Sequence, residues 1–289
     1  MDRTQKNSIV VNDADLFNFP TSPVLAAAKS ANTASNTTGP LILIDTTISY
    51  FSGISAAIKG GAIAASRQSF GLQNFADDTL WVPGGAQKPN QVSLGVNGGQ
   101  ALRMGFGGNL TADANNGYLT QAQNGQFGMN GVYTFGFVVR RPASGEVGGA
   151  NPGAGPILGA NNPGAPFNGI ILNYYTGMSV YHNGAPICGI STGETVGTSI
   201  AYLVSYDSAA KTLNIWQNGT YIGTSTGVAS NWNGGNLLLI GAAIFSGGAY
   251  YSQIDIAGVA LWPIQTFTVG STQAAAANAW LNQCRGNVT

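Results

Sequence analysis

The chain has 289 residues, a formal net charge of zero and 8% charged side chains, against roughly 25% in an average soluble domain. With no excess of either sign, nothing in its charge attracts it to nucleic acid or to an anionic membrane surface. Its 44% hydrophobic content is enough to build a core, so a wholly disordered chain is also excluded.

The lengths of its apolar stretches indicate where the protein is made. Near the N-terminus, Asp13 and Asp15 follow the short apolar stretch 8–11, which is too short for the hydrophobic region of a signal peptide. No segment approaches the roughly 18 apolar residues of a membrane span. We therefore expect a protein made in a cytoplasm, in which Cys188 and Cys284 are buried thiols rather than a disulfide.

Residues 1–40 are predicted to form an N-terminal arm. An alanine-rich stretch at 25–31 favours a short helix, and the Ser, Asn, Thr and Gly residues after it are typical of a linker. The ordered domain is predicted to span residues 41–289 and to begin with a β-rich stretch at 41–54. Short strands are expected at 80–82 and 91–96.

The middle of the chain contains a strong strand signal and a long loop signal. Residues 132–142 alternate, so that Tyr133, Phe135 and Phe137 share one face. Residues 143–169 are rich in Gly, Pro and Asn and are predicted to be a long loop. A pair of hairpins is expected over residues 169–190.

The segment "TSIAYLVSYDSAAKTLNIWQNGTYIGTSTG", residues 198–227, predicts three strands joined by two tight turns. Asn218-Gly219 is the strongest two-residue hairpin signal in the chain. Because strand side chains alternate, we expect one face of this ribbon to pack on a second sheet and the other to meet solvent. Two further strands are predicted at 236–245 and 253–263, and a helix at 271–285, with Ser271 as its N-cap.

Many short strands with turn signals every eight to twelve residues are typical of one fold class. They predict an all-β protein, an antiparallel β-sandwich or jelly roll, with an extended N-terminal arm and a short C-terminal helix.

From about residue 100 to residue 285, the order of segments resembles the laminin-G-like, concanavalin A-like jelly-roll superfamily. The matching features are Tyr206-Asp207 at a strand end, the Asn218-Gly219 hairpin and the strand residues 254–260. The closing helix resembles the one in bacterial and phage versions of the fold. The resemblance implies a scaffold that hosts lectins, glucanases and inert structural modules, so it indicates fold more than function.

Catalytic groups are sparse. Glucanases of this fold carry a Glu-x-Asp-x-x-Glu strand, whereas the two glutamates here, Glu146 and Glu194, lie in Gly-rich stretches. Asp255 is the carboxylate best placed on a strand, and we expect it at a surface or edge.

His182, the only histidine, is explained by the polarity of the neighbouring turn. No third ligand joins His182 and Cys188 in a zinc site. We predict no catalytic residue and no enzymatic activity.

Calcium is the one cofactor that the sequence leaves open, because loop Asp and Asn oxygens suit it. The spacing fits no dedicated calcium loop, so solvated loop residues are the preferred interpretation. The candidates are Asp77, Asp78, Asp113, Asn115, Asn116 and Asp207.

Aromatic side chains in predicted loops and on exposed faces are the candidate binding groups, because sugars stack on flat rings while amides bind their hydroxyls. In each adjacent pair, strand alternation should bury one ring and expose the other. Packing at sheet rims or against a partner subunit is the preferred interpretation of these rings, and glycan binding is the alternative. The candidate glycan-binding residues are Tyr174, Tyr175, Asn231, Trp232, Tyr250 and Tyr251.

The sequence favours a non-catalytic virion surface protein, a capsid decoration, cement or fibre-associated component anchored through its N-terminal arm. Its expected partners are capsid or other virion proteins and further copies of itself, with no nucleic acid and no membrane. The alternative is a carbohydrate-binding module for host glycan attachment, and a glycoside hydrolase is the third possibility.

Overall fold

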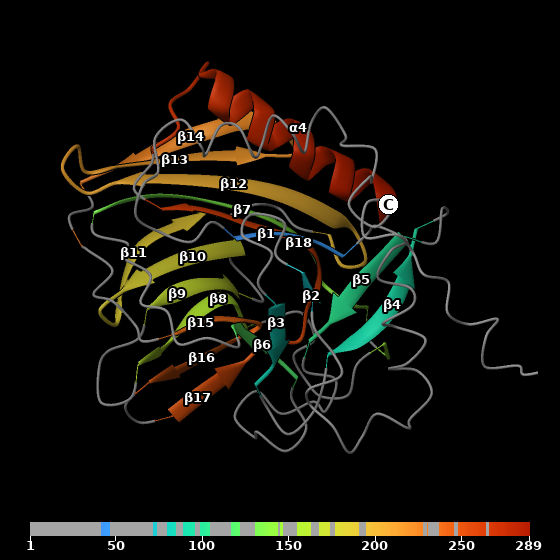
Figure 1. Ribbon diagram of the computed structural model, residues 1–289. Coiled ribbons are helices and arrows are strands. Elements are labelled where there is room, and N and C mark those ends of the chain that lie inside the picture. Colours follow the sequence, from blue (N-terminus) through green and yellow to red (C-terminus); the bar gives the residue numbers. More distant parts are fainter. Residues whose placement is uncertain are drawn as a thin grey trace, which may run out of the picture.

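A computed structural model of the chain describes residues 42–46, 72–73, 80–84, 89–95, 99–104, 117–121, 131–143, 145–146, 155–162, 168–173, 177–190, 195–227, 230, 237–245, 248–263 and 266–289. These residues form two stacked sheets with one helix on the outside (Figure 1). The all-β prediction, an antiparallel sandwich with a C-terminal helix, is confirmed. The predicted arm at residues 1–40 lies outside the described residues, and the domain boundaries stay a prediction.

The first sheet contains eight described strands, seven of them in the order β14-β13-β12-β7-β18-β5-β4. The eighth strand, β1, pairs with the same edge of β18 as β5 does, but further along β18. Neighbouring strands in it are antiparallel. Its strands are β1 (Ile42–Asp45), β4 (Asn90–Leu94), β5 (Gly99–Arg103), β7 (Val132–Arg140), β12 (Ser199–Asp207), β13 (Thr212–Gln217), β14 (Thr220–Thr226) and β18 (Asp255–Pro263).

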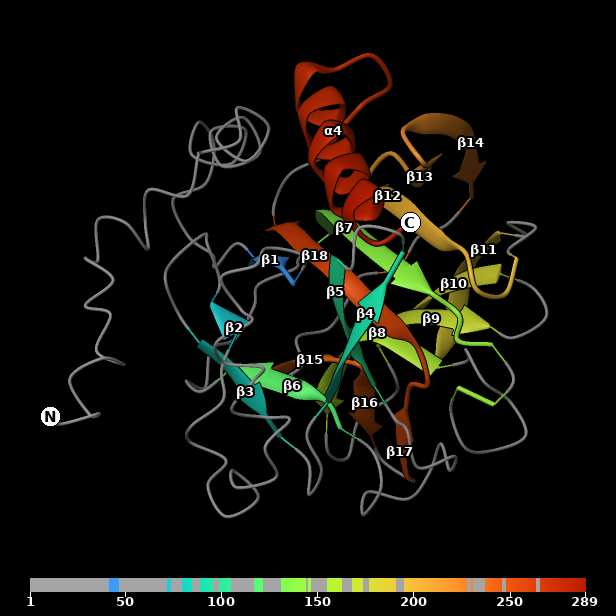
Figure 2. The same ribbon diagram turned by 90° about the vertical axis from the view of Figure 1, so that its right-hand side faces the viewer.

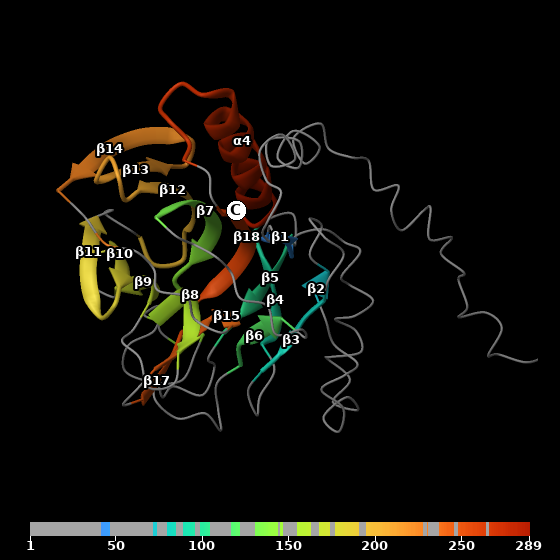
Figure 3. The same cartoon turned by 60° about the vertical axis from the view of Figure 1, so that its left-hand side comes forward.

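The second sheet runs β11-β10-β9-β8-β15-β6-β3-β2, with β16 paired in parallel to β8 and antiparallel to β17. Its edge strand β11 and the first sheet's edge strand β14 lie on the same side of the sandwich (Figure 3). Its strands are β2 (Leu72–Gln73), β3 (Leu80–Pro83), β6 (Leu119–Gln121), β8 (Gly155–Asn162), β9 (Gly169–Asn173), β10 (Gly177–His182), β11 (Ala185–Ile190), β15 (Leu237–Ile240), β16 (Ala242–Phe245) and β17 (Gly248–Tyr251).

The core between the sheets is built from the inward faces of β7 and β12. Tyr133, Phe135 and Phe137 point inward from β7, as predicted, and Tyr202 and Tyr206 join them from β12. All five side chains are at most 1% exposed. Burial of such large rings is the main favourable contribution to folding.

Helix α4 (Thr272–Asn287) covers the outer face of β7, β12 and β18 (Figures 1 and 2). Ser271 caps it, because its Oγ accepts a hydrogen bond from the N–H of Ala274 at 3.2 Å. The predicted helix and its cap are therefore confirmed.

One face of the ribbon at residues 198–227 was expected to meet solvent. This expectation is wrong for β12, whose first eight residues are buried, because α4 lies over that face.

Two predictions in the middle of the chain need correction. The long loop predicted at 143–169 contains β8, which lies in the centre of the second sheet with Ile157, Leu158 and Ala160 buried. Its glycines permit this, since a Cβ on Gly159 would lie 2.4 Å from the carbonyl oxygen of Ala242. The single strand predicted at 236–245 is two strands, because Gly241 adopts φ 84° between β15 and β16.

Both cysteines are free and buried, as predicted. None of the helices in the described part of the chain is long and apolar enough to cross a membrane.

Candidate functional site

The predicted glycan-binding residues are only partly within the described chain. Tyr250 and Tyr251 are adjacent on β17, and alternation separates them as expected: Tyr250 is 46% exposed, whereas Tyr251 is buried and packs against Tyr118 with ring centroids 5.8 Å apart. Tyr250 is thus the ring of this pair that a ligand can reach. The other four candidates, Tyr174, Tyr175, Asn231 and Trp232, lie outside the described residues.

Asp255 is the centre of an ion-pair cluster, not the surface or edge residue that the sequence indicated. Its side chain is fully buried, and it accepts hydrogen bonds from Arg103 at 2.7 and 2.9 Å and from Arg140 at 2.7 Å. The three residues lie at neighbouring ends of β5, β18 and β7. Hydrogen bonds from two guanidinium groups stabilise the buried carboxylate, which ties these strand ends together.

Glu146 completes this cluster from the following turn. Its carboxylate contacts Arg140 at 2.9 Å and Arg103 at 3.3 Å, and it also accepts from the N–H of Ala143. Burial alone would raise the pKa of Glu146, but the Ala143 hydrogen bond and the two arginines outweigh it and lower that pKa. Both described carboxylates considered for catalysis are therefore paired with arginine.

His182 is buried between the sheets, so the prediction that turn polarity explains it is wrong. Nδ1 lies 3.0 Å from the carbonyl oxygen of Ser230, so it carries the proton and donates it. Nε2 then accepts from the Tyr133 hydroxyl, 2.5 Å away. Burial lowers the pKa of His182 to about 4, although the Ser230 carbonyl partly opposes the shift. The imidazole is thus neutral at physiological pH.

Tyr206 extends this cluster to both backbone groups of Ser230. Its hydroxyl donates to the Ser230 carbonyl and accepts from the Ser230 N–H at 2.8 Å. Burial also raises the pKa of Tyr133 well above its usual value and raises that of Cys188, although a Ser225 hydrogen bond partly opposes the Cys188 shift. The cluster is uncharged, and it anchors the chain immediately before the predicted Asn231-Trp232 pair.

Of the residues considered for calcium, Asp207 lies within the described chain. Its Oδ1 accepts from the N–H groups of Ala209 and Ala210, both at 2.9 Å, which closes the turn between β12 and β13. Within the described ranges, no group of three or more His, Cys, Asp or Glu side chains is placed to hold a metal ion. Asp77, Asp78, Asp113, Asn115 and Asn116 lie outside those ranges, so calcium binding stays an open expectation.

A groove of about 370 Å³ lies between α4 and the β13–β14 hairpin and is here named the α4 groove. α4 packs mainly on the outer face of β12, β7 and β18, and the groove lies between the helix and the end of the β13–β14 hairpin at Trp216 and Gly219. One stripe of the helix forms its wall, at spacings of three and four residues. The lining residues are Trp216, Gly219, Gly270, Ser271, Ala274, Ala275, Asn278, Ala279 and Asn282.

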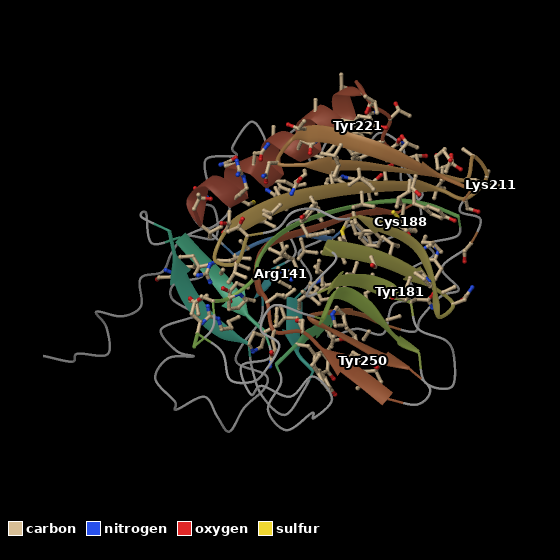
Figure 4. The ribbon with its side chains drawn as sticks, turned by 180° about the vertical axis from the view of Figure 1, so that it is seen from behind. Arg141, Tyr181, Cys188, Lys211, Tyr221 and Tyr250 are labelled. Atoms are coloured by element: carbon tan, nitrogen blue, oxygen red, sulfur yellow. The ribbon has the colours of Figure 1, made fainter. Side chains whose placement is uncertain are left out.

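An exposed tyrosine adjoins the α4 groove on the same face of the hairpin. Tyr221 on β14 is paired across the strands with Trp216, and their ring centroids are 5.6 Å apart. Trp216 is only 4% exposed and supports Tyr221, which is 37% exposed. Figure 4 shows Tyr221 on the strand layer beside α4, at the opposite side of the sandwich from Tyr250.

Polar side chains continue from Tyr221 along the same face. Its hydroxyl bonds to Oγ1 of Thr224, which donates to Oδ1 of Asn214 at 2.6 Å. The face therefore combines an accessible ring, hydroxyls and amides, and none of the nine residues that line the groove carries a charge. The alternation of Asn214 and Trp216 with buried Leu213 and Ile215 was the sequence signal that could have found it.

No protein-family model matches the chain. No curated protein matches its sequence. Among solved structures, the chain is similar to the binding domain of botulinum neurotoxin serotype G, with a TM-score of 0.47, 9% identity, and coverage of 71% of this chain and 48% of that domain. It is also similar to the binding domain of botulinum neurotoxin DC in complex with rat synaptotagmin II, with a TM-score of 0.47, 11% identity, and coverage of 75% and 49%.

A third similar structure is the CBM40 of the Ruminococcus gnavus IT-sialidase bound to α2,3-sialyllactose, with a TM-score of 0.41, 12% identity, and coverage of 51% of this chain and 83% of that one. The chain spans about half the length of the two neurotoxin domains. At TM-scores below 0.5 these similarities carry no argument about function. The resemblance to the laminin-G-like superfamily stays a prediction beyond the β-sandwich itself.

Proposed function

We propose that this protein is a non-catalytic carbohydrate-binding β-sandwich whose binding site is the α4 groove. The observation that carries the proposal is the composition of that groove: an exposed tyrosine beside it, amide and hydroxyl side chains on its wall, and no charged lining residue. A sugar ring presents apolar C–H groups to an aromatic face and hydroxyls to planar amides. The groove volume, about 370 Å³, lies in the range of about 300–1,000 Å³ that is usual for small-ligand sites.

The absence of catalysis is part of the proposal and is supported by the environment of two carboxylates. Asp255 and Glu146 are both paired with Arg103 and Arg140, and neither lines the α4 groove. A glycosidase needs two carboxyl groups facing one bond, about 5–9.5 Å apart, with one free to donate a proton. The Ala143 hydrogen bond and the two arginines lower the pKa of Glu146, so Glu146 is a poor proton donor.

The virion-surface role, with capsid partners, self-association and particle localisation, stays a prediction from composition. A carbohydrate-binding module on a particle surface would be compatible with it. The α4 groove favours the glycan-binding interpretation as the function to be tested first.

Two exposed tyrosines on opposite sides of the molecule provide a matched test. The wild-type chain, Tyr221→Ala and Tyr250→Ala should be compared on a glycan array, followed by calorimetric titration with any glycan that binds. We expect Tyr221→Ala to weaken binding by about tenfold, equivalent to about 1.4 kcal/mol and typical of one aromatic contact, while Tyr250→Ala leaves it unchanged. Absence of binding, or loss with Tyr250→Ala alone, would refute the proposed site.

A further inference from the structure

Asn282 lines the α4 groove and carries a buried acceptor without a partner. Oδ1 of Asn282 is inaccessible to solvent and makes no hydrogen bond within the described chain. A buried acceptor left unpaired is destabilising, so such an atom in a native structure calls for an explanation. An unpaired acceptor beside a groove is explained if a ligand supplies the donor.

The Asn282 amide is held against the β13–β14 turn. A Cβ built on Gly219 would lie 2.5 Å from Nδ2 of Asn282, so the amide reaches across to that glycine. The turn itself is fixed, because the Asn218 side chain accepts from the N–H of Ala201 at 3.0 Å and the Asn218 N–H donates to the Ala201 carbonyl at 2.7 Å. Because Oδ1 is inaccessible where it lies, the inference requires the Asn282 amide to turn away from Gly219 when a ligand hydroxyl donates to Oδ1.

The remaining groups in the groove disfavour an anionic ligand. None of the nine lining residues is cationic, and burying an anion without a counter-charge is costly. The partial positive charge at the N-terminus of α4 is smaller than a full counter-charge, and the Ser271 hydroxyl already accepts from one of its N–H groups, that of Ala274. The Asn278 amide is engaged too, since its Nδ2 donates to the Ala274 carbonyl at 2.9 Å.

From these contacts, and resting on the proposed glycan-binding function, we infer that the α4 groove takes an uncharged saccharide that donates a hydroxyl hydrogen bond to Oδ1 of Asn282. A carboxylate, sulfate or phosphate group at the same place offers only acceptors, so it would leave Oδ1 unpaired and add an uncompensated charge. The groove thereby selects neutral over acidic glycans.

The test uses the purified full chain and oligosaccharides in matched pairs, each neutral compound beside its sialylated or sulfated derivative, such as lactose with α2,3-sialyllactose. Affinities are measured by titration calorimetry. We expect the tightest ligands to be neutral, with their acidic derivatives at least tenfold weaker.

Two substitutions at one position separate recognition from stability. Asn282→Leu removes the acceptor and should weaken neutral-glycan binding at least tenfold, yet its melting temperature should equal or exceed that of the wild type, because an unpaired buried acceptor is gone. Asn282→Gln keeps an uncharged amide oxygen as acceptor and should bind within about threefold of the wild type. A merely structural asparagine would lower stability and binding together.

The outcomes distinguish this inference from the proposed function. If the wild-type chain binds no glycan, both fail. If it binds acidic glycans preferentially, or if Asn282→Leu retains full affinity, the inference fails while carbohydrate binding stands. Neutral preference together with loss of affinity only in Asn282→Leu supports it.

Discussion

His182, Tyr133 and Tyr206 form a neutral polar cluster that joins the two sheets. His182 on β10 and Tyr206 on β12 hydrogen-bond to the backbone of Ser230, which follows β14. Tyr133 on β7 holds the His182 ring in place through Nε2. Ring contacts surround the imidazole, with centroids of Tyr133 and Tyr206 at 5.6 and 5.1 Å. Protonation of His182 would bury a positive charge away from water, and this desolvation is why its pKa is low.

Stability should therefore fall in mild acid. The pKa of His182 is about 4 in the folded chain and about 6.5 when unfolded, so the unfolded state binds the proton more tightly. The contribution is fully present above pH 6.5 and is lost as the pH falls toward 4, by about 3 kcal/mol in all. Urea denaturation of the wild type at pH 7 and pH 5 should show about 2 kcal/mol of this loss.

His182→Gln is the control for this pH dependence, because His182 is the only histidine in the chain. The variant should be less stable than the wild type at pH 7, yet its unfolding free energy should change little between pH 7 and pH 5. An equal slope in both proteins would show that the imidazole is not the group responsible.

Helix α4 lies flat on the first sheet because glycines in the strands leave room for it. Gly136 lies under Leu281, where an added Cβ would lie 2.9 Å from Cδ1 of Leu281. Gly258 lies under Cys284, where an added Cβ would meet Cys284 at an ordinary contact distance of 3.4 Å. At the C-terminal end of the helix the fit is closer, since a Cβ on Gly99 of β5 would lie 1.7 Å from the carbonyl oxygen of Asn287 (Figure 2). This seating fixes the wall of the α4 groove.

Gly99→Ala and Gly258→Ala form a matched pair under the helix. Gly99→Ala forces the backbone at Asn287 to move and should lower the unfolding free energy by about 1–3 kcal/mol, as overpacking does. Gly258→Ala meets only ordinary contacts and should leave stability within about 1 kcal/mol of the wild type. Urea denaturation midpoints report both, and equal midpoints would mean that the helix end is not seated as described.

Local signals explain which elements were predictable. Alternation and the Asn218-Gly219 turn predicted β12, β13 and β14, and Asn218 and Gly219 have the φ angles of 51° and 83° that such a turn requires. β8 was missed because its Gly, Pro and Asn residues are typical of loops, and only its place between β9 and β15 makes it a strand. Tertiary pairing outweighed local preference there.

At the scale of the whole molecule, the sandwich was predictable and the candidate site was not. The period-two pattern contains the information that two sheets stack. It contains none about where α4 crosses the first sheet, and that position forms the groove between α4 and Trp216 of β13. Asp255 was misplaced for the same reason, because Arg103 and Arg140 are distant in sequence and meet it only across neighbouring strand ends.

The central claim is that an uncharged saccharide binds between α4 and the β13–β14 hairpin. A crystal structure of the chain with the neutral oligosaccharide of highest affinity tests it most directly. We predict a sugar ring over Tyr221 with a hydroxyl donating to Asn282. A saccharide seated on Tyr250, or at any site away from the α4 groove, would contradict the account.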